Sequence, residues 1–101
     1  MIRIFVKKEK DYFSSIRFKG HAMYDDYGKD IVCAGASSIL ITTVNGILKF
    51  GQTIKVTEQK DEVTITVLEK EKITNALLEN MLELLTELAE KYPRNILVKE
   101  D

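Results

Sequence analysis

The single cysteine and the single histidine of the chain lie in one short segment, residues 20–37. Cys33 falls in the first turn of a predicted helix, and His21 lies upstream of it, directly after a predicted strand. A thiol is a useful nucleophile only as the thiolate, and both a helix N-terminus and a neighbouring histidine favour that form. The pair therefore indicates nucleophilic catalysis, with Cys33 as the nucleophile and His21 as its base.

Other readings of these two residues stay open at this point. A lone cysteine in an intracellular domain is usually a buried small hydrophobe, and one cysteine with one histidine is a weak signature without a family context. A metal site is disfavoured, because the paired ligand spacings of structural zinc sites do not occur in the sequence. We therefore expect no metal and no cofactor.

Asp30 directly precedes the predicted helix, and its carboxylate has two possible roles. As an N-cap it would accept hydrogen bonds from the free amides of the first turn, which is the commoner role for an aspartate at this position. Turned toward His21, it would orient the imidazole as the third member of a triad. The amides near Cys33 and Ala34 are candidates for an oxyanion hole.

The elements that must position these residues follow from hydrophobic periodicity. Strands are expected at residues 1–8, 12–19, 53–57, 63–68 and 96–98, and helices at 31–50 and 73–92. Short polar connections make two hairpins of the first four strands, Gly51 ends the first helix and Pro93 stops the second. The prediction is one domain, 1–101, with an α+β fold: a compact sandwich of an antiparallel or mixed sheet and two long helices, in the order ββαββα(β).

Alternation and helical spacing also predict which side chains share one face of each element. In the first strand these are Ile2, Ile4 and Val6. In the second strand they are Tyr12, Ser14, Ile16 and Phe18. The second helix has an apolar stripe, widened on one side and opposed by an acidic face. The stripe is Ile73, Leu77, Met81, Leu84 and Leu88, widened by Leu78, Leu82, Leu85 and Ala89.

The first helix carries no charge before Lys49, which indicates that most of its circumference is covered by the sheet, the second helix or another subunit. Residues 31–48 have the length of a membrane span, but their serines, threonines and asparagine favour a buried helix in a soluble domain. We therefore expect a homodimer and no membrane association.

Charge and cysteine content bound the class of protein. The net charge of −1 comes from interspersed acids and bases, which argues against direct nucleic-acid binding and favours a protein substrate. One cysteine excludes an internal disulfide framework, and the first residues show no signal-peptide pattern. We expect a cytoplasmic protein.

The stretch G-H-A, a short loop and D-I-V-C-A-x-A-S resembles the signature of the ribosomal-processing cysteine protease (Prp) family. The order of elements and the length match as well, so the resemblance covers essentially the whole chain. It implies that Cys33 is the nucleophile and His21 the base. It further implies that Gly20, Asp30 and Ser37 support the site, and that the protein is a homodimer.

The resemblance also implies a substrate: a large-subunit ribosomal protein made with a short N-terminal extension, which the enzyme removes. Residues 23–29 would form a loop that closes over the peptide, with Tyr24, Tyr27 and Gly28 as candidate substrate contacts. Loop tyrosines are more often ordinary surface residues. The alternative function is a non-catalytic ribosome-associated assembly or binding module, in which Cys33 is a core residue.

Overall fold

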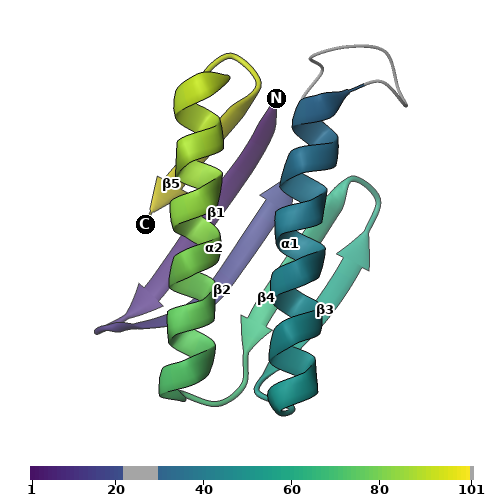
Figure 1. The fold of residues 1–101 in the computed structure, drawn as a ribbon. Helices are drawn as coiled ribbons and strands as arrows, with labels where there is room; N and C mark the ends of the chain where they lie inside the picture. The colour runs from purple at the N-terminus through teal and green to yellow at the C-terminus, as the bar shows by residue number, and fades with distance from the viewer. Residues whose placement is uncertain (22–29, 101) are drawn as a thin grey trace.

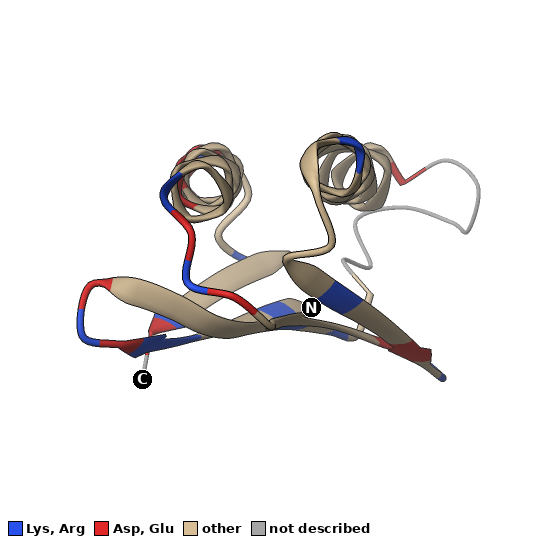
Figure 2. Ribbon diagram, turned by 90° about the horizontal axis from the view of Figure 1, so that it is seen from below, with Lys and Arg blue, Asp and Glu red and all other residues tan. Residues whose placement is uncertain are grey.

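The computed structural model describes residues 1–21 and 30–100. In this part of the chain, five strands form one sheet, and two long helices lie side by side on one of its faces (Figures 1 and 2). The elements are β1 (Ile2–Glu9), β2 (Tyr12–Lys19), α1 (Ile31–Phe50), β3 (Ile54–Gln59), β4 (Glu62–Val67), α2 (Lys72–Lys91) and β5 (Ile96–Glu100). The predicted α+β sandwich and its order ββαββα(β) are confirmed.

The strand order in the sheet is β3-β4-β2-β1-β5. All neighbours are antiparallel except β1 and β5, which are parallel, so the sheet is mixed. The pairing of β2 with β4 joins the two hairpins, and its register sets Lys19 opposite Glu62. The turn between β3 and β4 therefore lies beside the end of β2, where the chain continues to His21.

This turn is tighter than the sequence indicated. The polar run between the second pair of strands was expected to be a connection, but β3 continues to Gln59 and β4 begins at Glu62. Only Lys60 and Asp61 remain between them, and Asp61 adopts a φ of 59°. Aspartate is among the few residues with a side chain that enter this left-handed region readily.

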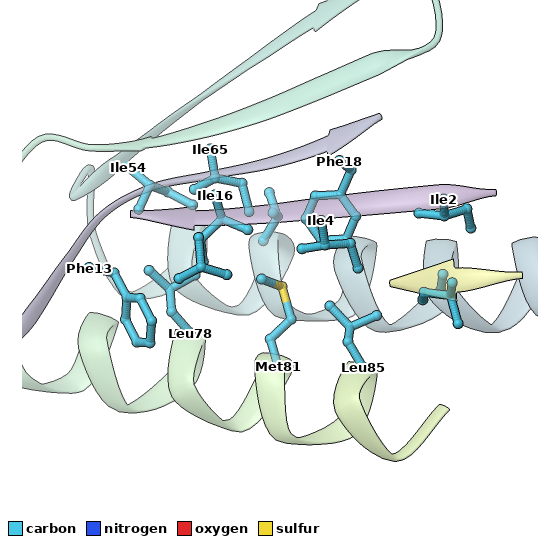
Figure 3. Close-up of a cluster of buried hydrophobic side chains, with 14 of the residues drawn as sticks. Ile2, Ile4, Phe13, Ile16, Phe18, Ile54, Ile65, Leu78, Met81 and Leu85 are labelled. Atoms are coloured by element: carbon cyan, nitrogen blue, oxygen red, sulfur yellow. The ribbon is translucent and has the colours of Figure 1, made fainter. Parts of the chain in front are cut away.

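The core lies between the sheet and the helices, and one strand fills it differently from the prediction. Ile2, Ile4 and Val6 of β1 are buried as expected. In β2 the register shifts opposite Lys7 and Lys8, so Phe13 joins Ile16 and Phe18 in the core (Figure 3). Tyr12 and Ser14, predicted to share the face of Ile16 and Phe18, are only partly buried. Such an irregularity changes which side chains share a face of the sheet.

The second helix buries the widened side of the predicted stripe. Its buried residues are Thr74, Leu78, Met81 and Leu85; of these, Leu78, Met81 and Leu85 were predicted and Thr74 was not. Ile73 and Leu84, at the other side of the stripe, are 48% and 41% exposed. The helix therefore lies on the sheet along the Leu78–Leu85 side, and the acids Glu79, Glu83, Glu87 and Glu90 face solvent as predicted.

The first helix is covered on one side within the single chain. Its buried residues are Val32, Ala36, Val44 and Ile47, whereas Ile41 is 56% exposed. Coverage of the remaining side by another subunit stays a prediction. Among the described residues, α1 is one helix whose length and composition would suit a membrane span, and 17% of that apolar window is buried.

Candidate active site

Asp30 is the N-cap of α1. Its backbone is extended, and its Oδ1 accepts hydrogen bonds from the amides of Val32 and Cys33, both at 3.0 Å. These amides have no acceptor within the helix, so the carboxylate satisfies donors that the first turn leaves open. Of the two roles considered for Asp30, the structure shows the capping role.

The same hydrogen bonds correct the prediction of free amides in the first turn. The Cys33 amide donates to the Asp30 side chain at 3.0 Å, and the Ala34 amide donates to the Asp30 carbonyl at 3.0 Å. The prediction treated both amides as available for an oxyanion. In this structure each already has an acceptor, because the capping carboxylate and the first helical hydrogen bond occupy them.

Cys33 lies in the first turn of α1 and is half-buried, packed against the edge of the core. Ser37 follows one helical turn later and is exposed, so the two side chains belong to the same side of the helix. Gly35 lies against α2, where a Cβ would meet Leu88 Cδ2 at 3.7 Å, which is ordinary van der Waals contact. The small residue at this position therefore faces the second helix.

Gly20 fixes the path of the chain just before His21. Its φ is 90°, and a Cβ built on it would lie 2.6 Å from the carbonyl oxygen of Met1. Only glycine adopts this conformation without strain, and only glycine fits so close to the neighbouring backbone. The Gly20 amide also donates to the backbone carbonyl of Asp61 at 2.9 Å, which ties the end of β2 to the β3–β4 turn.

His21 directly follows this anchored glycine, and its ring contacts Asp61. The distance from His21 Nε2 to Asp61 Oδ1 is 2.7 Å, and the two side chains are 58% and 51% exposed. Asp61 was not singled out from the sequence. The only available signal was an aspartate in a predicted hairpin connection, and nothing in the sequence showed that this hairpin would pair with the strand that ends at His21.

The described site residues lie in two groups at one end of the molecule, and one of the groups includes the unpredicted Asp61. Figure 1 shows the end of β2, the start of α1 and the β3–β4 turn at that end. One group joins His21 to Asp61, and the other joins Asp30 to Cys33. The pairing of the histidine with the thiol stays a prediction. The predicted substrate-loop residues, Tyr24, Tyr27 and Gly28, lie outside the described residues.

The described residues form no metal site. Within residues 1–21 and 30–100, no group of three or more histidine, cysteine, aspartate or glutamate side chains is arranged to hold a metal ion. What the described site does offer is a thiol at the positive end of a helix and a histidine with a carboxylate partner. These are parts of a nucleophilic site.

Comparison with known proteins decides the family. The model of the family described as "Cysteine protease Prp" matches residues 1–97. The chain belongs to the Prp family of cysteine proteases. The resemblance stated from the G-H-A and D-I-V-C-A segments is thereby confirmed.

Individual relatives agree with the Prp assignment. The ribosomal processing cysteine protease Prp of Staphylococcus aureus is 59% identical over 29 residues, which cover 29% of this chain and 27% of the relative. This local match therefore spans about a quarter of that relative's length. Two crystal structures of the S. aureus Prp, described as an essential ribosomal processing protease, match over 100% of both chains. The complex with a covalently linked product peptide has 26% identity and a TM-score of 0.94. The complex with a substrate peptide has 25% identity and a TM-score of 0.88.

Proposed function

We propose that this protein is a cysteine endopeptidase that removes the N-terminal extension of a large-subunit ribosomal protein during ribosome maturation. The observation that carries the proposal is the match of the Prp family model to residues 1–97. The similar S. aureus structures hold a substrate peptide and a product peptide, which supports a peptide as the substrate here.

The proposed mechanism assigns one role to each of two side chains. The Cys33 thiolate attacks the scissile carbonyl carbon at the positive end of α1, which favours the negative charge that develops there. The C–N bond breaks as the His21 imidazolium gives its proton to the leaving amine, and a thioester remains on Cys33. Water then attacks the thioester, His21 accepts its proton, and the thiolate departs from the new carboxylic acid. The chain needs no cofactor for these steps.

Residues outside this pair are proposed to support the site. Gly20 sets the backbone that presents His21, and Asp30 caps the helix that presents Cys33. Ser37 lies one turn beyond the nucleophile on an exposed position. A several-fold loss of cleavage rate in Ser37→Ala with unchanged stability would favour a role in the site, whereas loss of stability alone would assign Ser37 to packing.

We also propose a homodimer in the cytoplasm, formed through the uncovered face of α1. This face mixes large apolar and small polar side chains, and Ile31 and Ile41 on the helix are 57% and 56% exposed. The helix carries no charge before Lys49, so a second copy of the same face would meet it without unpaired charges. Measuring the molar mass in solution tests this, and a monomer at micromolar concentration would contradict it.

The decisive experiment offers the protein a substrate. The purified protein is incubated with an extended large-subunit ribosomal protein, and mass spectrometry measures loss of the extension. We expect cleavage by the wild type and no cleavage by Cys33→Ala or Cys33→Ser with the fold retained. His21→Ala is expected to be nearly as damaging. Full cleavage by both Cys33 variants would refute the nucleophile, and normal turnover by His21→Ala would refute the base.

The rival function, a non-catalytic ribosome-associated binding module, predicts that the Cys33 thiol is unreactive. Cys33 is half-buried against the core, so its reactivity distinguishes the two functions. A catalytic thiolate reacts rapidly and stoichiometrically with an alkylating reagent at neutral pH and loses this reactivity in mild acid. An inert thiol, together with an absence of cleavage, would support the binding module.

A further inference from the structure

We infer that Asp61, in the turn between β3 and β4, is a positioning residue for His21: it holds the Nε2–H of the imidazole and leaves Nδ1 as the nitrogen that accepts the proton of the Cys33 thiol. This inference rests on the proposed function, because it assigns a partner to the proposed base. It adds a residue that lies in another hairpin, distant in sequence from both His21 and Cys33.

The chemistry of the contact determines the tautomer. The Asp61 carboxylate oxygen lies 2.7 Å from His21 Nε2. An ionised carboxylate only accepts hydrogen bonds, so Nε2 must carry a proton for this contact to be a hydrogen bond. A neutral imidazole carries one ring proton, and the lone pair is then on Nδ1. A base that acts on a thiol needs that lone pair, so Nδ1 is the reactive nitrogen.

The backbone of both partners is fixed, which distinguishes this pair from an ordinary surface ion pair. Exposed pairs between long side chains contribute little, because ordering the side chains costs entropy. Here both side chains are short, and the Gly20 amide donates to the Asp61 carbonyl at 2.9 Å beside the side-chain contact. Gly20 itself lies against the first residue of the chain, where a Cβ would be 2.6 Å from the Met1 carbonyl oxygen. The β2–β4 pairing, with Lys19 opposite Glu62, holds the residues next to Gly20 and Asp61 side by side.

The same carboxylate would act again after proton transfer. Once Nδ1 has taken the thiol proton, the ring is an imidazolium, and its positive charge lies next to the Asp61 carboxylate. The attraction between the two opposite charges then adds to the hydrogen bond that the carboxylate already accepts. Asp61 thus supports both the orientation of the neutral base and the charged form that follows. Cys–His–Asn arrangements in papain-like proteases show that an amide oxygen can fill the same position.

The backbone conformation of Asp61 dictates which variants test the inference. Its φ of 59° is left-handed, so alanine would add strain unrelated to the side-chain contact. Asp61→Gly removes the carboxylate, keeps the carbonyl that binds the Gly20 amide, and tolerates this φ. Asp61→Asn keeps an acceptor oxygen and also tolerates this φ. Lys60→Ala changes the neighbouring turn residue and serves as the matched control.

The first measurement needs no substrate. His21 is the only histidine, so long-range proton–nitrogen correlation spectra of labelled protein report its tautomer without overlap. At a pH where the ring is neutral, we expect a single Nε2–H tautomer in the wild type, Asp61→Asn and Lys60→Ala. In Asp61→Gly we expect a measurable Nδ1–H fraction. An Nδ1–H tautomer in the wild type, or populations unchanged in Asp61→Gly, would overturn the inference.

The second measurement is steady-state cleavage of an extended large-subunit ribosomal protein. For Asp61→Gly we expect kcat to fall about 10- to 100-fold, the scale of a misoriented catalytic group, with KM within about twofold. Asp61→Asn should recover most of this loss, and Lys60→Ala should match the wild type. A kcat for Asp61→Gly equal to that of the wild type would overturn the role of Asp61 and leave the proposed function standing. Cleavage by Cys33→Ala, in contrast, refutes the proposed function.

Discussion

The carboxylate of Asp30 and the backbone amide of Cys33 are joined by a hydrogen bond of 3.0 Å. The residue that begins the helix therefore places a negative charge close to the residue that is proposed to ionise. The cap stabilises α1, while we expect its charge to slow the reactions of the Cys33 sulfur as a nucleophile, because like charges repel. Stability and thiol reactivity should respond in opposite directions when this charge is removed.

Asp30→Asn tests that opposition. The amide oxygen of asparagine can accept the same hydrogen bonds from Val32 and Cys33, so we expect the free energy of unfolding to change by less than about 0.5 kcal/mol. Loss of the negative charge should increase the rate at which Cys33 is alkylated at neutral pH. Chemical denaturation and alkylation followed by mass spectrometry measure the two effects.

Asp30→Ala is the matched control, because it removes the cap and the charge together. It should destabilise the protein by about 1 kcal/mol, the usual effect of losing an aspartate N-cap. Slower alkylation of Cys33 in Asp30→Asn than in the wild type would contradict the electrostatic part of the argument.

Substituting alanine for two of the glycines should change the free energy of unfolding in opposite directions. Gly20→Ala places a Cβ 2.6 Å from the Met1 carbonyl oxygen at a φ of 90°, so we expect a loss of about 1–3 kcal/mol of unfolding free energy and displacement of His21. Gly46 lies in α1, and a Cβ there would have no atom within 4 Å. Gly46→Ala should therefore stabilise the protein by about 1 kcal/mol through helix propensity. Equal effects of the two substitutions in denaturant titrations would disprove this account.

A buried pair of hydroxyl groups links α2 to the segment before β3. Thr53 Oγ1 and Thr74 Oγ1 lie 2.6 Å apart, and both residues are buried. Thr74 Oγ1 also donates to Glu71 Oε1 at 3.0 Å. We expect Thr74→Val to destabilise more than Thr53→Val, because it removes both hydrogen bonds.

A double-mutant cycle measures the Thr53–Thr74 contact by thermal or chemical unfolding. Each single substitution is expected to cost about 1–3 kcal/mol, since the partner hydroxyl loses a buried hydrogen bond. The double variant Thr53→Val/Thr74→Val should cost less than the sum of the two. Strict additivity would show that the two hydroxyls do not interact.

The N-cap of α2 predicts a specific dependence of stability on pH. The backbone amide of Ile73, followed by that of Thr74, donates to the Glu71 carboxylate and lowers its pKa below the usual 4.5. Because the folded-state pKa lies below the unfolded value, the contribution of Glu71 is complete above pH 4.5. It is lost as the pH falls through the lowered pKa.

Glu71→Gln isolates this effect from the other carboxylates. Between about pH 6 and about pH 3, the free energy of unfolding should fall less in Glu71→Gln than in the wild type. Urea titrations at a series of pH values measure the difference. Parallel curves for the two proteins would show that Glu71 does not contribute through its charge.

Much of the fold was predictable because its signals are local. The alternation of Ile2, Ile4 and Val6 predicted a strand with one buried face, and the structure has it. Asp30 and Gly51 marked the two ends of α1, which runs over Ile31–Phe50 as expected. Caps and periodicity act within a few residues, so the sequence displays them directly.

The remaining features depend on contacts between distant segments. The register shift in β2 brings Phe13 into the core in place of Tyr12 and Ser14, and only the pairing with β1 reveals it. The contact of His21 with Asp61 likewise depends on the pairing of β2 with β4. The reactive groups of Cys33 and His21 are visible in the sequence, whereas the partner of the histidine depends on the topology of the sheet.

The parallel pairing of β1 with β5 has a consequence for the order of folding. Ile2 and Ile96 are register partners, so β1 can form its pairing with β5 only after β5 has been synthesised. During synthesis β1 remains an open edge until β5 has left the ribosome, and closing so long a loop is slow compared with forming the hairpins. We therefore expect the sheet to be completed only after the last strand has emerged, with the β1–β2 hairpin and α1 already formed.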